Sequence, residues 1–116
     1  MEKIISKIAG LGIPGLILMV AIEATGLAGA AAITAALAAL GPGGMLGGVA
    51  LLCAAGLVAD ALAEYGFSAI FEAVIRELYV RGETKDTIRA KIARYPVSKA
   101  LKAKLMEEVN RFSAVM

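Results

Sequence analysis

The feature that most constrains this chain is a run of thirty-six residues, 24–59, without a charged side chain. A soluble amphipathic helix keeps one polar face toward water, so helices formed from this run need apolar surroundings on every side. The whole chain is 59% hydrophobic, whereas ordinary soluble domains contain about 45–50% apolar residues. The run therefore has to be covered by other protein or by lipid.

A turn signal divides this run nearly in half. Gly41, Pro42, Gly43 and Gly44 follow one another. Proline cannot continue the interior of a helix, and glycine adopts the backbone angles of a tight reversal. We therefore predict an all-α fold in which an apolar helical hairpin turns at these four residues and is flanked by amphipathic helices.

The length of the hairpin arms points to a membrane. The arms are 24–41 and 44–59, and Glu23 and Asp60 are the first charged residues beyond them. At about 1.5 Å rise per residue, both acids lie roughly 26–30 Å from the turn, which is about the thickness of a bilayer's hydrocarbon core. We predict a membrane protein with a transmembrane hairpin. Because the arms are short for spanning, incomplete insertion and burial in a soluble bundle are the alternatives.

Small side chains along the hairpin predict self-association. Residues without bulk at every fourth position let helix backbones approach closely, which is the small-xxx-small mode of packing in lipid. Both arms carry such faces. Packing the two arms of one chain against each other would not use all of this small-residue surface, so the remainder is available to another copy of the chain. We therefore expect a glycine-rich homo-oligomer whose packing residues are Gly29, Ala32, Ala36, Gly44, Gly47, Gly48 and Ala55.

The segment before the hairpin contains two pieces. Ile4, Ile5, Ile8 and Leu11 share one helical face, which is typical of a short amphipathic helix on a membrane surface or at the end of a bundle. Glycines and a proline then interrupt the helix. The apolar stretch 13–22 has only ten residues and cannot span a membrane alone, so we expect it to extend the first arm or to lie in the interface.

The segment after the hairpin reads as conventional amphipathic helices. Apolar residues at helical spacing predict a helix over 67–80, supported by i,i+4 pairs of Glu72 with Arg76 and of Glu77 with Arg81. Gly82 ends this helix. We therefore divide the chain into residues 1–82, with the hairpin and its flanking helices, and residues 83–116, a basic C-terminal helical pair.

Two N-cap signals define the helices of the C-terminal pair. Thr84 precedes a helix that ends at Arg94, and Ser98 precedes a second helix after the break at Pro96. The second helix carries an apolar stripe at near-helical spacing, formed by Leu101, Leu105, Val109 and Phe112. The unit is therefore a small helix-turn-helix arrangement.

The C-terminal pair is strongly basic. Its cations are either a solvated face or a surface for anionic lipid or a protein partner. Nucleic-acid binding is not expected, because only Tyr95 offers a ring for base stacking. Basic termini on both sides of the hairpin place both ends in the cytoplasm, with a cytoplasmic assembly as the alternative. The contact residues that we expect are Lys85, Arg89, Lys91, Arg94, Lys99, Lys102 and Lys104.

No catalytic site, cofactor site or metal site is expected. The chain has no histidine and one cysteine, so the commonest general base and a thiolate metal site are both missing. Glu23, Asp60 and Glu64 are predicted to lie together at the base of the hairpin. There they either mark the water interface or form a proton or cation site.

These patterns predict a small helical protein that inserts into the lipid bilayer, self-oligomerises, and forms a pore or perturbs the bilayer. The long uncharged hairpin bounded by amphipathic helices resembles the hydrophobic hairpin of pore-forming colicins, and the small size with a basic tail resembles a phage holin. The resemblance covers residues 13–80 and is architectural, so it assigns no functional residue. The alternatives are a structural protein that assembles into a ring, shell or filament, and a membrane anchor that recruits a partner through its C-terminal helices.

Overall fold

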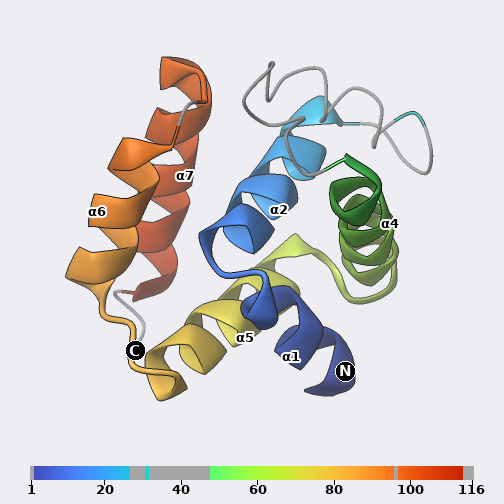
Figure 1. The fold of residues 1–116 in the computed structure, drawn as a ribbon, viewed down its shortest axis with the longest axis horizontal. Coiled ribbons are helices and arrows are strands. Elements are labelled where there is room, and N and C mark those ends of the chain that lie inside the picture. The colour runs from blue at the N-terminus through green and yellow to red at the C-terminus, as the bar shows by residue number, and fades with distance from the viewer. Residues whose placement is uncertain (1, 27–30, 32–47, 96, 114–116) are drawn as a thin grey trace.

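The computed structural model describes residues 2–26, 31, 48–95 and 97–113, and this part of the chain contains six α-helices and no strand (Figure 1). The predicted all-α class is confirmed. The helices are α1 (Glu2–Gly10), α2 (Ile13–Thr25), α4 (Gly48–Tyr65), α5 (Phe67–Val80), α6 (Lys85–Arg94) and α7 (Lys99–Ser113).

Helix α2 is the centre of the fold. It contacts each of the other five described helices, and Ile13 and every residue from 15 to 22 are buried. Figure 1 shows α2 between α4 on one side and the α6–α7 pair on the other, with α1 and α5 across its starting end. The apolar stretch 13–22 is therefore the core of the bundle, and it takes neither of the two roles expected for it, as an extension of the hairpin arm or as an interfacial segment.

The start of α2 combines a sharp bend with close packing. Gly12 has φ +70°, a left-handed conformation that favours glycine, and Pro14 lies in the first turn of the helix as predicted. Gly15 packs against α1 so closely that a Cβ built there would lie 2.6 Å from the carbonyl oxygen of Ile8. The absent side chain at Gly15 therefore sets the distance between α1 and α2.

The amphipathic helices that cover α2 follow the sequence prediction. The guanidinium of Arg76 lies 2.7 Å from the Glu72 carboxylate, and that of Arg81 lies 3.3 Å from Glu77. Arg81 also donates hydrogen bonds to the carbonyl and hydroxyl oxygens of Ser6, at 3.1 and 3.0 Å, which ties α1 to the end of α5.

Both predicted N-caps of the C-terminal pair are confirmed. The Thr84 hydroxyl accepts a 3.1 Å hydrogen bond from the Thr87 amide at the start of α6. The Ser98 hydroxyl accepts a 3.2 Å hydrogen bond from the Leu101 amide at the start of α7. The apolar stripe of α7 is buried, and α7 contacts α2, α5 and α6. The proposed division of the chain after residue 82 stays a prediction.

The second hairpin arm differs from its predicted limits. Helix α4 continues to Tyr65, so Asp60 and Glu64 lie within the helix and not beyond its end. Gly66, with φ +86°, then separates α4 from α5. Ala55 is fully buried in the core of the single chain, and Gly48 is the first residue of α4. The other predicted turn and packing positions lie outside the described residues: Gly29, Ala32, Ala36, Gly41, Pro42, Gly43, Gly44 and Gly47.

The described residues give no support to a transmembrane hairpin. No single helix among them is long and apolar enough to cross a membrane. Only α1 and α2 taken together meet the requirements of length and composition, and they are bent by 110° at their junction.

Two glycine substitutions test the packing at the start of α2. Gly15→Ala should lower the free energy of unfolding by about 1–3 kcal/mol, because the new methyl group overpacks the α1–α2 contact. Gly56→Ala is the matched control, because no described atom lies within 4 Å of a Cβ built at this position of α4. It should raise the free energy of unfolding by about 0.5–1 kcal/mol through helix propensity. Denaturant unfolding followed by circular dichroism measures both, and changes of the same sign would contradict the close contact.

Candidate functional site

A cleft lined by four charged side chains lies at the end of α2. We call it the Glu108 cleft. It has a volume of about 550 Å³ and lies between the end of α2, the α4–α5 junction and α7. Its lining residues are Glu23, Tyr65, Gly66, Phe67, Ser68, Ala69, Lys104, Glu108 and Arg111.

Glu108 is the unusual member of this cleft. Its exposed fraction is 8%, and it is the one charged residue buried in the part of the chain that the structure describes. Its Oε2 is buried without a hydrogen-bond partner among the described residues. Its Oε1 lies 4.0 Å from Nη1 of Arg111, whose side chain is 69% exposed. An ion pair with so exposed a partner contributes little, so the chain supplies Glu108 with poor compensation for its burial.

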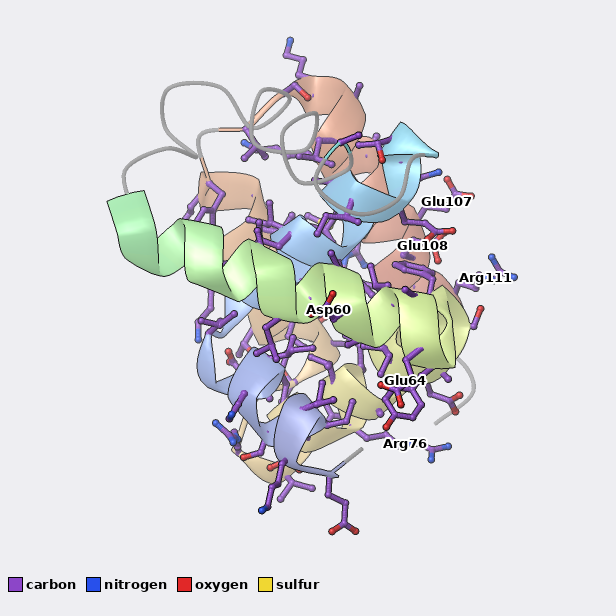
Figure 2. The ribbon with its side chains drawn as sticks, turned by 90° about the vertical axis from the view of Figure 1, so that its right-hand side faces the viewer. Asp60, Glu64, Arg76, Glu107, Glu108 and Arg111 are labelled. Atoms are coloured by element: carbon purple, nitrogen blue, oxygen red, sulfur yellow. The ribbon has the colours of Figure 1, made fainter. Side chains whose placement is uncertain are left out.

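The rest of the cleft provides further charge and aromatic surface. Figure 2 shows Glu107, Glu108 and Arg111 together on α7. Phe67 lines the cleft, and the Phe112 ring lies 6.3 Å from Phe67 and 5.3 Å from Phe71, measured between ring centroids. The cleft thus joins one buried carboxylate to exposed charges of both signs.

The three predicted acids do not share one site. Glu23 lines the Glu108 cleft, whereas Asp60 and Glu64 are exposed on α4 and do not line it (Figure 2). Among the described residues, no group of three or more histidine, cysteine, aspartate or glutamate side chains is placed to hold a metal ion. Glu23 therefore shares a cleft with Glu108, whereas the sequence predicted that it would lie beside Asp60 and Glu64.

Sequence reasoning overlooked Glu108, although the signal was present. The apolar stripe of α7 repeats at spacings of three and four residues, and Glu108 occupies such a position between Leu105 and Phe112. An acid on the apolar face of an amphipathic helix is buried when that face packs. A search for charged residues at positions of the apolar stripe would have identified Glu108.

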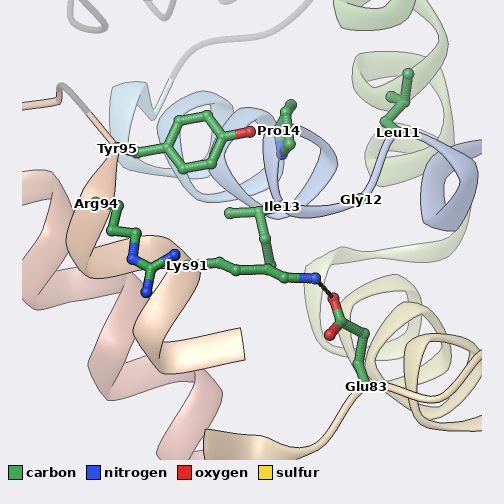
Figure 3. Close-up of a pocket in the computed structure, with 8 residues that line it drawn as sticks. All are labelled: Leu11, Gly12, Ile13, Pro14, Glu83, Lys91, Arg94 and Tyr95. Atoms are coloured by element: carbon green, nitrogen blue, oxygen red, sulfur yellow. Dashed lines mark hydrogen bonds and ion pairs between the residues drawn. The ribbon is translucent and has the colours of Figure 1, made fainter. Parts of the chain in front are cut away.

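A second cleft lies at the opposite end of α2. It has a volume of about 370 Å³ and is bounded by the α1–α2 connection and the end of α6 (Figure 3). Its charged members are Glu83, Lys91 and Arg94, with the ring of Tyr95 beside them. The ammonium of Lys91 donates a 2.6 Å hydrogen bond to Oε2 of Glu83, and the Thr87 hydroxyl donates one of 2.8 Å to Oε1. The hydrogen bond from Lys91, supported by that from Thr87 and by the charge of Lys91, lowers the pKa of the Glu83 carboxyl against an opposing effect of burial.

The predicted basic residues are divided among several environments. Lys91 pairs with Glu83, and the ammonium of Lys102 donates a 2.9 Å hydrogen bond to the carbonyl oxygen of Ala93 near the end of α6. Lys104 lines the Glu108 cleft and Arg94 the second cleft. The remaining three lie on the surface, Lys85 half-buried and Arg89 and Lys99 exposed.

Comparisons with known proteins add no information about the family. No family model matches the sequence, no curated protein matches it, and no solved structure matches the fold.

The ion pair in the second cleft predicts a pH-dependent loss of stability. A carboxyl whose pKa is lowered in the folded protein stabilises it above its ordinary pKa of 4.5, and that contribution is lost as the pH falls through the lowered value. Lys91→Gln should therefore reduce the free energy of unfolding at pH 7 by up to about 1 kcal/mol. The difference from the unmodified protein should disappear at pH values below the lowered pKa. Unfolding curves across this range measure it, with Arg89→Gln on the same helix as the control, and a pH-independent difference would contradict it.

The burial of Glu108 predicts that its removal stabilises the fold. Glu108→Gln keeps the shape and removes an undercompensated charge, so the free energy of unfolding in buffer without added ligand should rise by about 1–3 kcal/mol. Glu107→Gln, at the exposed neighbouring position, should have little effect. If Glu108→Gln instead destabilises the protein, a cation of the chain such as Lys104 already pairs with the carboxylate in solution.

Proposed function

We propose that this protein attaches to lipid bilayers through the uncharged residues 27–47 and self-associates there to form a pore or perturb the bilayer. The observation that carries the proposal is the position of the two helices that bracket this segment. In Figure 1 the end of α2 and the start of α4 both lie in the upper part of the molecule, and Figure 2 shows them on opposite sides of that part. Residues 27–47 therefore connect two points on opposite sides of the upper part of the bundle.

The composition of the segment supports contact with lipid. Residues 27–47 contain no charge, and Thr34 is the single polar side chain among them. The core of the described bundle is already built around α2, whereas a segment of this composition gains free energy from further burial of its apolar side chains. Lipid provides such burial at the end of the bundle.

The available length favours insertion into one leaflet. Ala55 is the first fully buried residue of α4 among its described side chains, so we take residues 27–40 and 45–53 as the two arms on either side of the turn. At about 1.5 Å per residue, helices of these lengths reach about 14–21 Å, short of the roughly 30 Å of a hydrocarbon core. We therefore favour the incomplete-insertion alternative over the spanning hairpin.

Basic residues support an orientation toward anionic lipid. In Figure 1 the junction of α6 and α7 also lies in the upper part of the molecule. Lys99 begins α7 at this junction. Each cation near an anionic membrane surface contributes about 1 kcal/mol to binding. In this arrangement the bundle lies on the cytoplasmic face of the membrane, and copies associate through the small residues of the segment.

Flotation with vesicles that contain phosphatidylglycerol tests the proposal. The unmodified protein should float with the vesicles, and release of an entrapped dye distinguishes a pore from simple attachment. Leu37→Asp should reduce the bound fraction more than tenfold, because an aspartate deep in a bilayer costs about 2.5–3.5 kcal/mol. Ala63→Asp, at an exposed position of α4, adds the same charge outside the segment and should bind normally.

Other outcomes separate the alternative functions. Equal loss of flotation in both variants, or no flotation of the unmodified protein, would contradict attachment to the bilayer through residues 27–47. Large particles in the absence of lipid would then favour the self-assembling structural protein. Vesicle binding without dye release or self-association would favour the membrane anchor.

A further inference from the structure

We propose that the Glu108 cleft binds a small molecule that carries a primary ammonium group next to an anionic group. The ammonium lies against Glu108, and the anionic group lies at the rim beside Lys104 and Arg111. None of the lining residues belongs to the segment 27–47, and the proposal does not depend on membrane binding.

Glu108 supplies the fixed charge of the site. It is 8% exposed and its Oε2 has no hydrogen-bond partner among the described residues, yet the residue lines a cleft of about 550 Å³. Buried polar atoms in native proteins almost always have a hydrogen-bond partner, so this oxygen is suited to a donor from outside the described residues. A partner for a carboxylate oxygen has to donate hydrogen bonds, and a positive charge makes the interaction stronger.

The shape of the site selects among cations. A metal ion would require several further acidic or amide ligands, and the described residues hold no group of three candidate side chains. A primary ammonium needs one strong acceptor and places its remaining donors toward other oxygens, and Glu23 lines the same cleft. A quaternary ammonium has no N–H to donate, so it cannot satisfy the Glu108 oxygen.

The rim of the cleft supplies the complementary charges. Lys104 and Arg111 both line it, and both are exposed. Lys104 can therefore turn toward an anionic group at low cost, and Arg111 lies beside Glu108 with Nη1 4.0 Å from Oε1. A ligand of ordinary size fits, because binding sites for small molecules usually have volumes of about 300–1,000 Å³. The pairing of a buried acid with exposed bases thus fits a zwitterion whose positive end enters first.

Phosphoethanolamine and phosphocholine form a matched pair of probes. They carry the same phosphate, and they differ in the three methyl groups that replace the N–H donors. Isothermal titration calorimetry on the full chain should give a dissociation constant for phosphoethanolamine at least tenfold lower than that for phosphocholine. Glu108→Gln should weaken phosphoethanolamine binding at least tenfold, whereas Glu107→Gln at the exposed neighbouring position should change it less than twofold.

Several results would overturn the proposal. These are no binding of phosphoethanolamine, equal binding of the two probes, or equal losses in the two variants. The comparison of probes uses the unmodified protein, so it remains decisive even if a variant fails to fold.

Vesicles distinguish the two sources of this chemistry. Tighter binding to phosphatidylethanolamine than to phosphatidylcholine, lost in Glu108→Gln, would identify a lipid headgroup as the ligand. Selective binding of soluble phosphoethanolamine without a preference between the vesicles would identify a free small molecule. Glu108→Gln should leave flotation with phosphatidylglycerol vesicles unchanged, so a failure of this site and a failure of the proposed bilayer attachment give different results.

Discussion

The burial of α2 is the constraint on which the rest of the structure depends. A helix that is apolar around its whole circumference cannot rest on a single neighbour, because any face left open would meet water. Five helices therefore surround it, each with its own apolar side turned inward. The close contact at Gly15 fixes how α1 approaches, and α7, whose apolar stripe is buried, contacts α2 on the side away from α4 (Figure 1).

Both clefts follow from the two ends of this central helix. Neighbouring helices cover the sides of α2 closely, whereas the chain must turn away at its ends, and side chains there do not close the surface completely. The second cleft forms where Gly12 and Pro14 start the helix, and the Glu108 cleft forms beside Glu23 near its end. Charged residues of α6 and α7 reach these ends because the α6–α7 pair lies along α2. The fold that buries the apolar helix thereby gathers charge at its ends.

The central position of α2 also changes the meaning of the uncharged run. Part of the apolar surplus is used to build a core, and the segment 27–47 between α2 and α4 carries the remainder. The proposed insertion into one leaflet follows from length, because helical arms of residues 27–40 and 45–53 would be shorter than a hydrocarbon core.

The sequence by itself determined the local structure. The spacing of apolar residues and the hydrogen bonds of helix caps act within one or two helical turns. We could therefore predict the helix limits around Thr84 and Ser98, the break before Pro14 and the ion pairs of α5. Only the tertiary structure decided which apolar segment became the core and which polar residues met. Apolar composition measures the need for burial and does not say whether protein or lipid provides it. Glu23 and Glu108 are eighty-five positions apart, and they line one cleft because α2 and α7 pack side by side.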